Sequence, residues 1–109
     1  MTIKNKVTRK TLKTLEKISG HKLTFGRLLS SIRQGEEESQ ISFAGKLEIS
    51  KQYLCDLERG RRFPSVGAAA EYARKLGYAE SQFVRLCLQD MVDKEGLGLE
   101  VSISALAVA

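Results

Sequence analysis

The sequence predicts an all-α fold of five helices, with a basic N-terminal extension and a short C-terminal β-strand. Apolar residues recur at helical spacing in five successive segments, and serine or threonine precedes four of these segments. Near the C-terminus, apolar residues occupy alternate positions instead, which is the pattern of a strand. The expected helices span approximately residues 25–35, 40–47, 51–59, 66–76 and 80–92.

Length and composition predict one globular domain without a membrane span. The chain has 109 residues, of which 42% are hydrophobic and 28% are charged. Its two cysteines, Cys55 and Cys87, form no disulfide framework, and no secretory signal begins the sequence. No apolar run approaches the length needed to cross a bilayer. We therefore expect a reduced, cytoplasmic protein that does not bind a membrane.

Positive charge is concentrated at the N-terminal end. The net charge is +5, and residues 1–35 contain nine lysines and arginines against one acidic residue. This balance favours an anionic partner. Residues 1–21 form a basic extension, in which Leu12, Leu15 and Ile18 indicate a short, marginal helix. The extension either stays solvated and disordered or adds sequence-independent affinity for DNA.

Two of the expected helices are short and are joined by a short turn, which is the helix-turn-helix plan. On the second of them, Leu54 and Leu57 lie on one side. Gln52, Asp56 and Arg59 lie on the other side. We expect the leucines to face the core and the polar residues to face a partner. Such side chains near a helix N-terminus suit base edges and phosphates in a major groove.

The stretch "SQISFAGKLEISKQYLCDLERGRRFPS", residues 39–65, resembles the DNA-binding core of the XRE family, the helix-turn-helix proteins related to phage Cro and phage repressors. The resemblance extends over about residues 23–77. It is carried by Gln40, Phe43, Ala44, Leu47, Ile49, Ser50, Leu54, Leu57, Glu58, Gly60, Pro64 and Ser65. It implies a helix-turn-helix domain over residues 22–92 and a transcription repressor that binds a palindromic operator in double-stranded DNA as a homodimer.

The resemblance also implies which side chains contact DNA. Gln40 would bind a phosphate and brace Gln52. Glutamine can bond adenine, lysine can reach guanine acceptors, and aspartate can accept from cytosine. Arginines after the second short helix would bind phosphates. The expected contact residues are Gln40, Ser50, Lys51, Gln52, Tyr53, Asp56, Arg59, Arg61 and Arg62. No cofactor and no metal ion is expected.

Several of these positions also have a structural interpretation. Tyr53 either reads a base or packs on the flank of its helix. Asp56 either accepts from a base or repels phosphate and so excludes wrong sequences. Arg61 and Arg62 either bind phosphates or form only a solvated turn. Glu58 is expected to pair with an arginine of the first expected helix rather than to contact DNA.

The turn departs from the family pattern at one residue. Glu48 stands where the family often has glycine, and that position commonly adopts a left-handed conformation. A residue other than glycine costs about 1–2 kcal/mol there. We expect the turn to be weakened but formed, because the apolar anchors around it remain.

The tail at residues 93–109 is expected to contain a strand at residues 97–103 and to mediate dimerisation. An isolated strand leaves its backbone groups unpaired, so it needs a partner. The candidates are the same segment of a second copy, a strand near Ile3–Thr8, or another protein. The alternative to a paired strand is a disordered tail.

An antitoxin of a type II toxin–antitoxin pair is the alternative function. The basic extension or the tail would then bind a toxin protein, and the protein would also repress its own promoter. An enzyme is not expected. His21 is the only histidine, and no nucleophile–base pair, metal-ligand cluster or glycine-rich phosphate loop is recognisable.

Overall fold

A computed structural model describes residues 22–106 of the chain. Its five helices are α2 (Phe25–Gly35), α3 (Gln40–Leu47), α4 (Lys51–Glu58), α5 (Val66–Leu76) and α6 (Glu80–Lys94). The five helices predicted from the sequence are confirmed, and each bound agrees within two residues. The basic extension, the marginal helix expected within it and the possible strand near Ile3–Thr8 lie outside the described residues.

Four helices begin at the cap residues that the sequence predicts. Thr24, Ser39, Ser50 and Ser65 each accept a hydrogen bond, 3.0–3.2 Å long, from the backbone N–H three residues later. Each bond satisfies one of the donors that the first turn of a helix leaves unpaired. The start of α6, at Ala79, has no side-chain cap. These local bonds fix where the helices begin.

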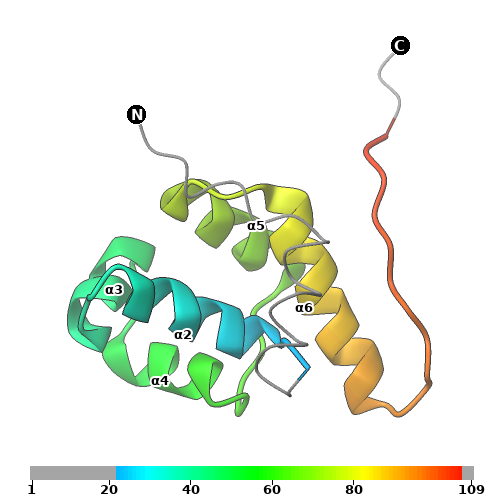
Figure 1. The fold of residues 1–109 in the computed structure, drawn as a ribbon, viewed down its shortest axis with the longest axis horizontal. Helices are drawn as coiled ribbons and strands as arrows, with labels where there is room; N and C mark the ends of the chain where they lie inside the picture. Colours follow the sequence, from blue (N-terminus) through cyan, green and yellow to red (C-terminus); the bar gives the residue numbers. More distant parts are fainter. Residues whose placement is uncertain (1–21, 107–109) are drawn as a thin grey trace.

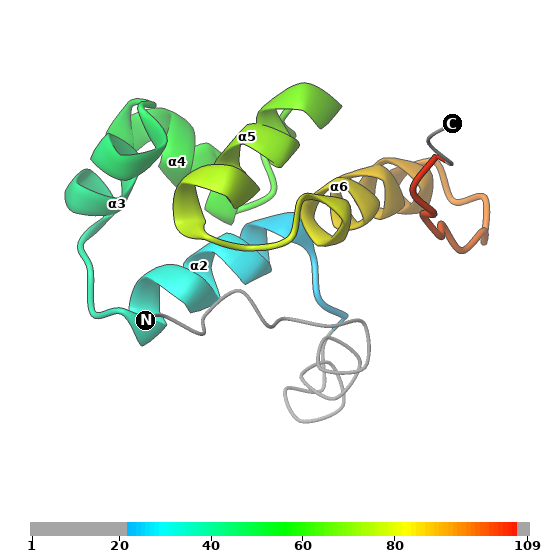
Figure 2. The ribbon, with the colours of Figure 1, turned by 90° about the horizontal axis from the view of Figure 1, so that it is seen from above.

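The five helices enclose one hydrophobic core. α5 packs against α6, α2 packs against α4 and α6, and α3 packs against α4 and α5 (Figure 1; Figure 2). Phe25 and Phe83 are fully buried, and their rings meet edge to face with centroids 5.7 Å apart. This contact joins the start of α2 to α6. None of the helices in residues 22–106 is long and apolar enough to span a membrane.

The predicted C-terminal strand is wrong for the described residues. Residues 97–106 form no strand. Strand hydrogen bonds need a neighbouring strand, and residues 22–106 supply none. Gly98 also adopts a left-handed φ of 66°, which interrupts the extended backbone between Leu97 and Leu99.

The tail instead runs back alongside α6 (Figure 1), where the Gln89 side chain binds it. Gln89 is only 6% exposed. Its amide nitrogen donates to the Leu99 carbonyl at 2.9 Å, and its amide oxygen accepts from the Val101 N–H at 2.8 Å. A single side-chain amide therefore satisfies two backbone groups that a neighbouring strand would have paired.

The start of α2 lies against the end of α4 because residue 26 is glycine. A Cβ atom added to Gly26 would lie 2.2 Å from the carbonyl oxygen of Leu57 and 2.9 Å from that of Glu58. Both are backbone atoms, so no change of side-chain rotamer would relieve the clash. The missing side chain therefore sets the separation of α2 and α4.

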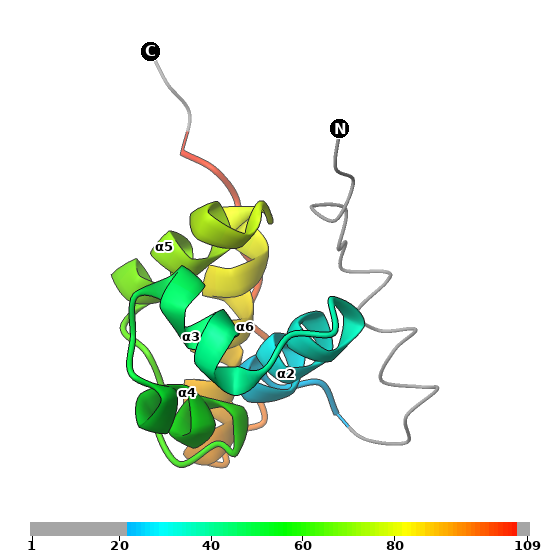
Figure 3. The same cartoon turned by 90° about the vertical axis from the view of Figure 1, so that its left-hand side faces the viewer.

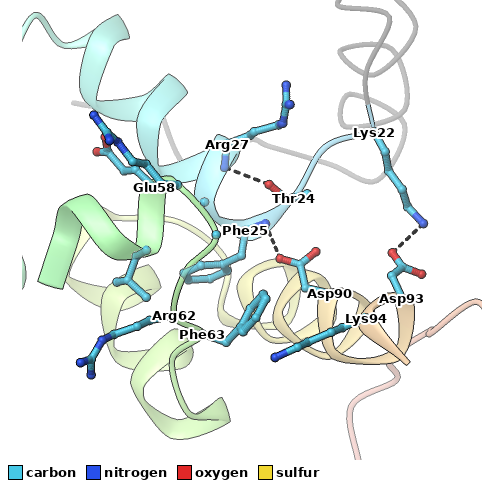
Figure 4. Close-up of a pocket in the computed structure, with 14 residues that line it drawn as sticks. Lys22, Thr24, Phe25, Arg27, Glu58, Arg62, Phe63, Asp90, Asp93 and Lys94 are labelled. Carbon is cyan, nitrogen blue, oxygen red and sulfur yellow. Dashed lines mark hydrogen bonds and ion pairs between the residues drawn. The ribbon is translucent and has the colours of Figure 1, made fainter. Parts of the chain in front are cut away.

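A buried carboxylate joins α6 to the start of α2. Asp90 is 7% exposed, and its carboxylate accepts a hydrogen bond from the Phe25 N–H at 2.8 Å (Figure 4). Burial raises the pKa of Asp90 to about 6, although the bond from Phe25 acts in the opposite direction. Asp93, one turn away, is paired with Lys22 at 2.6 Å, and this hydrogen bond lowers the pKa of Asp93.

Gly26→Ala is expected to lower the free energy of unfolding by about 3 kcal/mol, because α2 and α4 must separate to admit the methyl group. Denaturant unfolding measures this change. Gly45→Ala is the matched control, since a Cβ atom at Gly45 meets no atom within 4 Å. Alanine should stabilise α3 there by up to about 1 kcal/mol. Equal destabilisation by the two substitutions would contradict the close contact at Gly26.

Asp90→Asn is expected to stabilise the protein by about 1–3 kcal/mol at pH 7 and to have little effect below about pH 4. Because the pKa of Asp90 is raised, the folded state binds its proton more tightly than the unfolded state does. Proton binding by Asp90 therefore stabilises the folded wild type. This contribution is complete below about pH 4 and is lost as the pH rises to about 6. Asparagine remains neutral throughout and can still accept the Phe25 bond. Unfolding of both proteins between pH 4 and 8 measures the difference.

Asp93→Asn is the control, because it should change the free energy of unfolding at neutral pH in the opposite direction. The lowered pKa of Asp93 means that its carboxylate stabilises the folded state at neutral pH, and that this stabilisation is lost as the pH falls through the lowered pKa. The Asp93 variant should therefore be less stable than the wild type at pH 7. If the free energy of unfolding changed with pH in the same way for the wild type and Asp90→Asn, burial would not raise the pKa of Asp90.

Candidate nucleic-acid interface

α3 and α4 are joined by a three-residue turn, Glu48–Ser50, and form the predicted helix-turn-helix unit (Figure 3). Glu48 adopts the left-handed conformation expected at this position, with φ 60° and ψ 42°. Its N–H donates to the Gly45 carbonyl at 3.2 Å, and the Ile49 N–H donates to the Ala44 carbonyl at 3.0 Å. These bonds close the end of α3. Ile49 is half-buried and packs against the core.

An ion pair between α2 and α4, with a hydrogen bond from α3, joins these three helices. Arg33 donates through Nε and Nη2 to the two oxygens of Glu58 at 2.8 and 3.1 Å. The Glu58 side chain is 6% exposed and also accepts from the Gln40 amide at 3.1 Å. The predicted pairing of Glu58 with an arginine of the first expected helix is therefore confirmed. Gln40 contacts Glu58 instead of bracing Gln52, because the buried carboxylate needs a further donor.

The outer side of α4 carries the side chains predicted to read bases. Lys51 and Gln52 are exposed in its first turn, directly after the capping residue Ser50. Asp56 follows one turn later, and the Gln52 amide donates to its carboxylate at 3.2 Å. Tyr53 is half-buried and packs against the core, as the structural interpretation of this residue requires.

The loop after α4 folds back onto Asp56. Arg61 Nη1 and Arg62 Nε lie 3.6 and 3.4 Å from its two carboxylate oxygens. The Arg61 N–H also donates to the Asp56 carbonyl at 2.9 Å, and the Arg62 guanidinium lies 5.8 Å from the centre of the Tyr53 ring. Arg59 is exposed, without an ion-pair partner in the part of the chain that the structure describes. The polar residues of this region, here named the α4 surface, are Lys51, Gln52, Asp56, Arg59, Arg61 and Arg62.

A hollow of about 670 Å³ lies next to the α4 surface, between the start of α2, the end of α4 and α6 (Figure 4). Its lining includes Lys22, Phe25, Arg59, Arg62, Phe63 and Lys94. The Lys94 ammonium lies 5.3 Å from the centre of the Phe63 ring. Within residues 22–106, no group of three histidine, cysteine or carboxylate side chains could hold a metal ion. The hollow is lined by cationic side chains and also by the carboxylates of Glu58, Asp90 and Asp93, so it is mixed in charge and holds no metal-binding set among the described residues.

Sequence reasoning missed two residues that position this region. Gly26 brings α2 against the end of α4, and Asp90 holds the start of α2 on α6. A glycine inside an amphipathic helical pattern was a usable signal for Gly26. An acidic residue among the apolar residues of α6 was a weaker signal for Asp90, because its partner is a backbone N–H far away in the sequence.

Comparison with known proteins relates part of the chain to a phage protein. Over 62 residues, the chain is 34% identical to the immunity repressor protein of Bacillus phage phi105. The chain is similar to a phage repressor. The aligned stretch covers 57% of this chain and 43% of the phage protein, so the chain spans less than half the length of that relative. No protein-family model matches the chain, and no solved structure is significantly similar to it.

Glu48→Gly is expected to raise the free energy of unfolding by about 1 kcal/mol, because glycine adopts the left-handed conformation without a steric penalty. Glu48 also pairs with Lys75 at 3.0 Å, but its side chain is 76% exposed and the pair contributes little. Glu48→Ala is the control, since it removes the same carboxylate and keeps the strain. Thermal unfolding should rank the glycine variant first. A melting temperature below that of Glu48→Ala would show that the strain at this residue is negligible.

Proposed function

We propose that the protein is a sequence-specific transcription repressor that binds a palindromic operator in double-stranded DNA as a homodimer. The observation that carries this proposal is the α3–α4 unit, whose second helix exposes Lys51 and Gln52 beside an arginine-containing loop. The similarity to a phage immunity repressor supports the same class of function.

In this proposal, α4 enters the major groove and the adjoining loop follows the phosphate backbone. Gln52 bonds an adenine edge and Lys51 reaches guanine acceptors. The arginines of the loop bind phosphates, which supply affinity and register but no base preference. Gln40 lies at the start of α3, where the helix N-terminus is suited to a phosphate, while its amide donates to Glu58. Ser50 and Tyr53 act mainly by fixing the first turn of α4.

Dimerisation is proposed because one α4 helix reads only one half of a palindrome. Two copies would place their α4 helices in successive major grooves, about 34 Å apart. The tail supports this arrangement, because Leu97 and Leu99 are each 59% exposed and Leu106 is 91% exposed. A two-fold axis through such a segment would bury the same apolar residues of both copies.

Selection of bound duplexes from a random DNA pool tests the proposal directly. We expect one enriched sequence made of two inverted half-sites, with centres about one helical turn apart.

Gln52→Ala should weaken binding to this site by about tenfold and relax the preference at one base pair of each half-site. Arg59→Ala should weaken binding to all duplexes and reduce the slope of log affinity against log salt concentration by about 1.

Arg74→Ala is the matched control for the loss of a cation. Arg74 lies in α5, where it pairs with Glu80 at 2.9 Å. Its removal should change binding much less than that of Arg59. A pool without enrichment would refute sequence-specific binding. An enriched site that Gln52→Ala binds as well as the wild type does would refute the assignment of α4 to the groove.

The exposed apolar tail also fits the alternative function as an antitoxin, because a toxin protein could cover the same leucines. The neighbouring gene separates the two functions. A small adjacent gene whose product copurifies with this protein would favour the antitoxin. A protein that purifies alone as a dimer and represses its operator would favour the repressor.

A further inference from the structure

The Asp56 carboxylate is contacted by three other side chains of the α4 surface, namely Gln52, Arg61 and Arg62. Its side chain is 16% exposed, whereas Arg61 and Arg62, which lie against it, are 58% and 64% exposed. Gln52 donates to the same carboxylate from one helical turn away. The negative charge is therefore covered by three of the side chains that the proposed function assigns to DNA.

These contacts place the Asp56 carboxylate in competition with DNA phosphates. Each guanidinium directs one nitrogen toward the carboxylate, Arg61 through Nη1 and Arg62 through Nε. A two-pronged contact with a phosphate that uses this nitrogen requires the guanidinium to leave Asp56. Arg59 differs from its neighbours in this respect, since it has no ion-pair partner among residues 22–106. Two arginines of the loop thus have an internal counter-ion, and the third does not.

We propose that Asp56 determines specificity by holding Arg61 and Arg62 away from the phosphates of unrelated DNA, an inference that rests on the proposed function. On an operator, a cytosine amino group opposite Asp56 donates the hydrogen bond that the arginines give up. The arginines then move to phosphates. On other sequences the arginines could reach phosphates only if the carboxylate gave up its partners without gaining a donor, so they stay on Asp56 and binding is opposed.

The test compares the wild type and Asp56→Asn on two duplexes of equal length, one with the site recovered from the random pool and one without it. Asp56→Asn should raise the affinity for the unrelated duplex about five- to tenfold, because two ion pairs no longer oppose binding. The ratio of the two affinities should fall by about tenfold. A second selection with the variant should relax the preference for one C·G pair in each half-site, because the asparagine amide also donates and can therefore bond adenine.

Glu80→Gln is the matched control. It removes the same charge and weakens the pairing of an arginine, since Glu80 accepts from Arg74 at 2.9 Å while Glu71 stays paired with that arginine. It lies at the start of α6 instead of on the α4 surface. We expect it to change either affinity by less than about twofold. Thermal unfolding of both variants verifies that each is folded.

Two results would overturn the inference while leaving the proposed function intact. The first is an equal gain in affinity for the unrelated duplex in Asp56→Asn and Glu80→Gln, which would reflect net charge alone. The second is an unchanged affinity ratio in Asp56→Asn. A wild-type protein with no sequence preference would instead refute the proposed function, and the inference with it, so the two kinds of failure are distinguishable.

Discussion

The ion pair between Arg33 and Glu58 is the interaction on which the arrangement of α2, α3 and α4 depends. The Glu58 carboxylate is almost completely buried, and a buried charge is tolerated only when it is paired and hydrogen-bonded. Arg33 supplies two donors from α2, and Gln40 supplies a third from α3. Gly26 permits this arrangement, because it lets the backbone of α2 approach the end of α4. The orientation of the α4 surface follows from these constraints.

Helix positions and caps could be predicted because each depends on residues within one turn of one another. Ser50 caps α4 through the N–H three residues later, and Glu48 is left-handed because the chain reverses there between two helices. The tail could not be predicted in the same way. Its alternating pattern indicates a strand, but strand formation depends on a partner, and Gly98 and Gln89 determine a different course.

The candidate site was predictable in its composition but not in its contacts. Helical periodicity alone places Gln52, Asp56 and Arg59 on the outer side of α4. Periodicity does not show that the following loop folds back. The ion pairs of Asp56 with Arg61 and Arg62 therefore could not be predicted from it. These contacts arise from the path of the loop, which is set by tertiary packing.

The tail, which is attached through Gln89, opens at a lower free energy than the five helices unfold. The bonds to Leu99 and Val101 join an otherwise largely exposed segment to a helix that is itself fixed in the core. Breaking them opens the tail locally and leaves the five helices intact, at a small fraction of the free energy of global unfolding. We therefore expect the C-terminal segment to exchange its amide hydrogens or its contacts while the five helices remain folded.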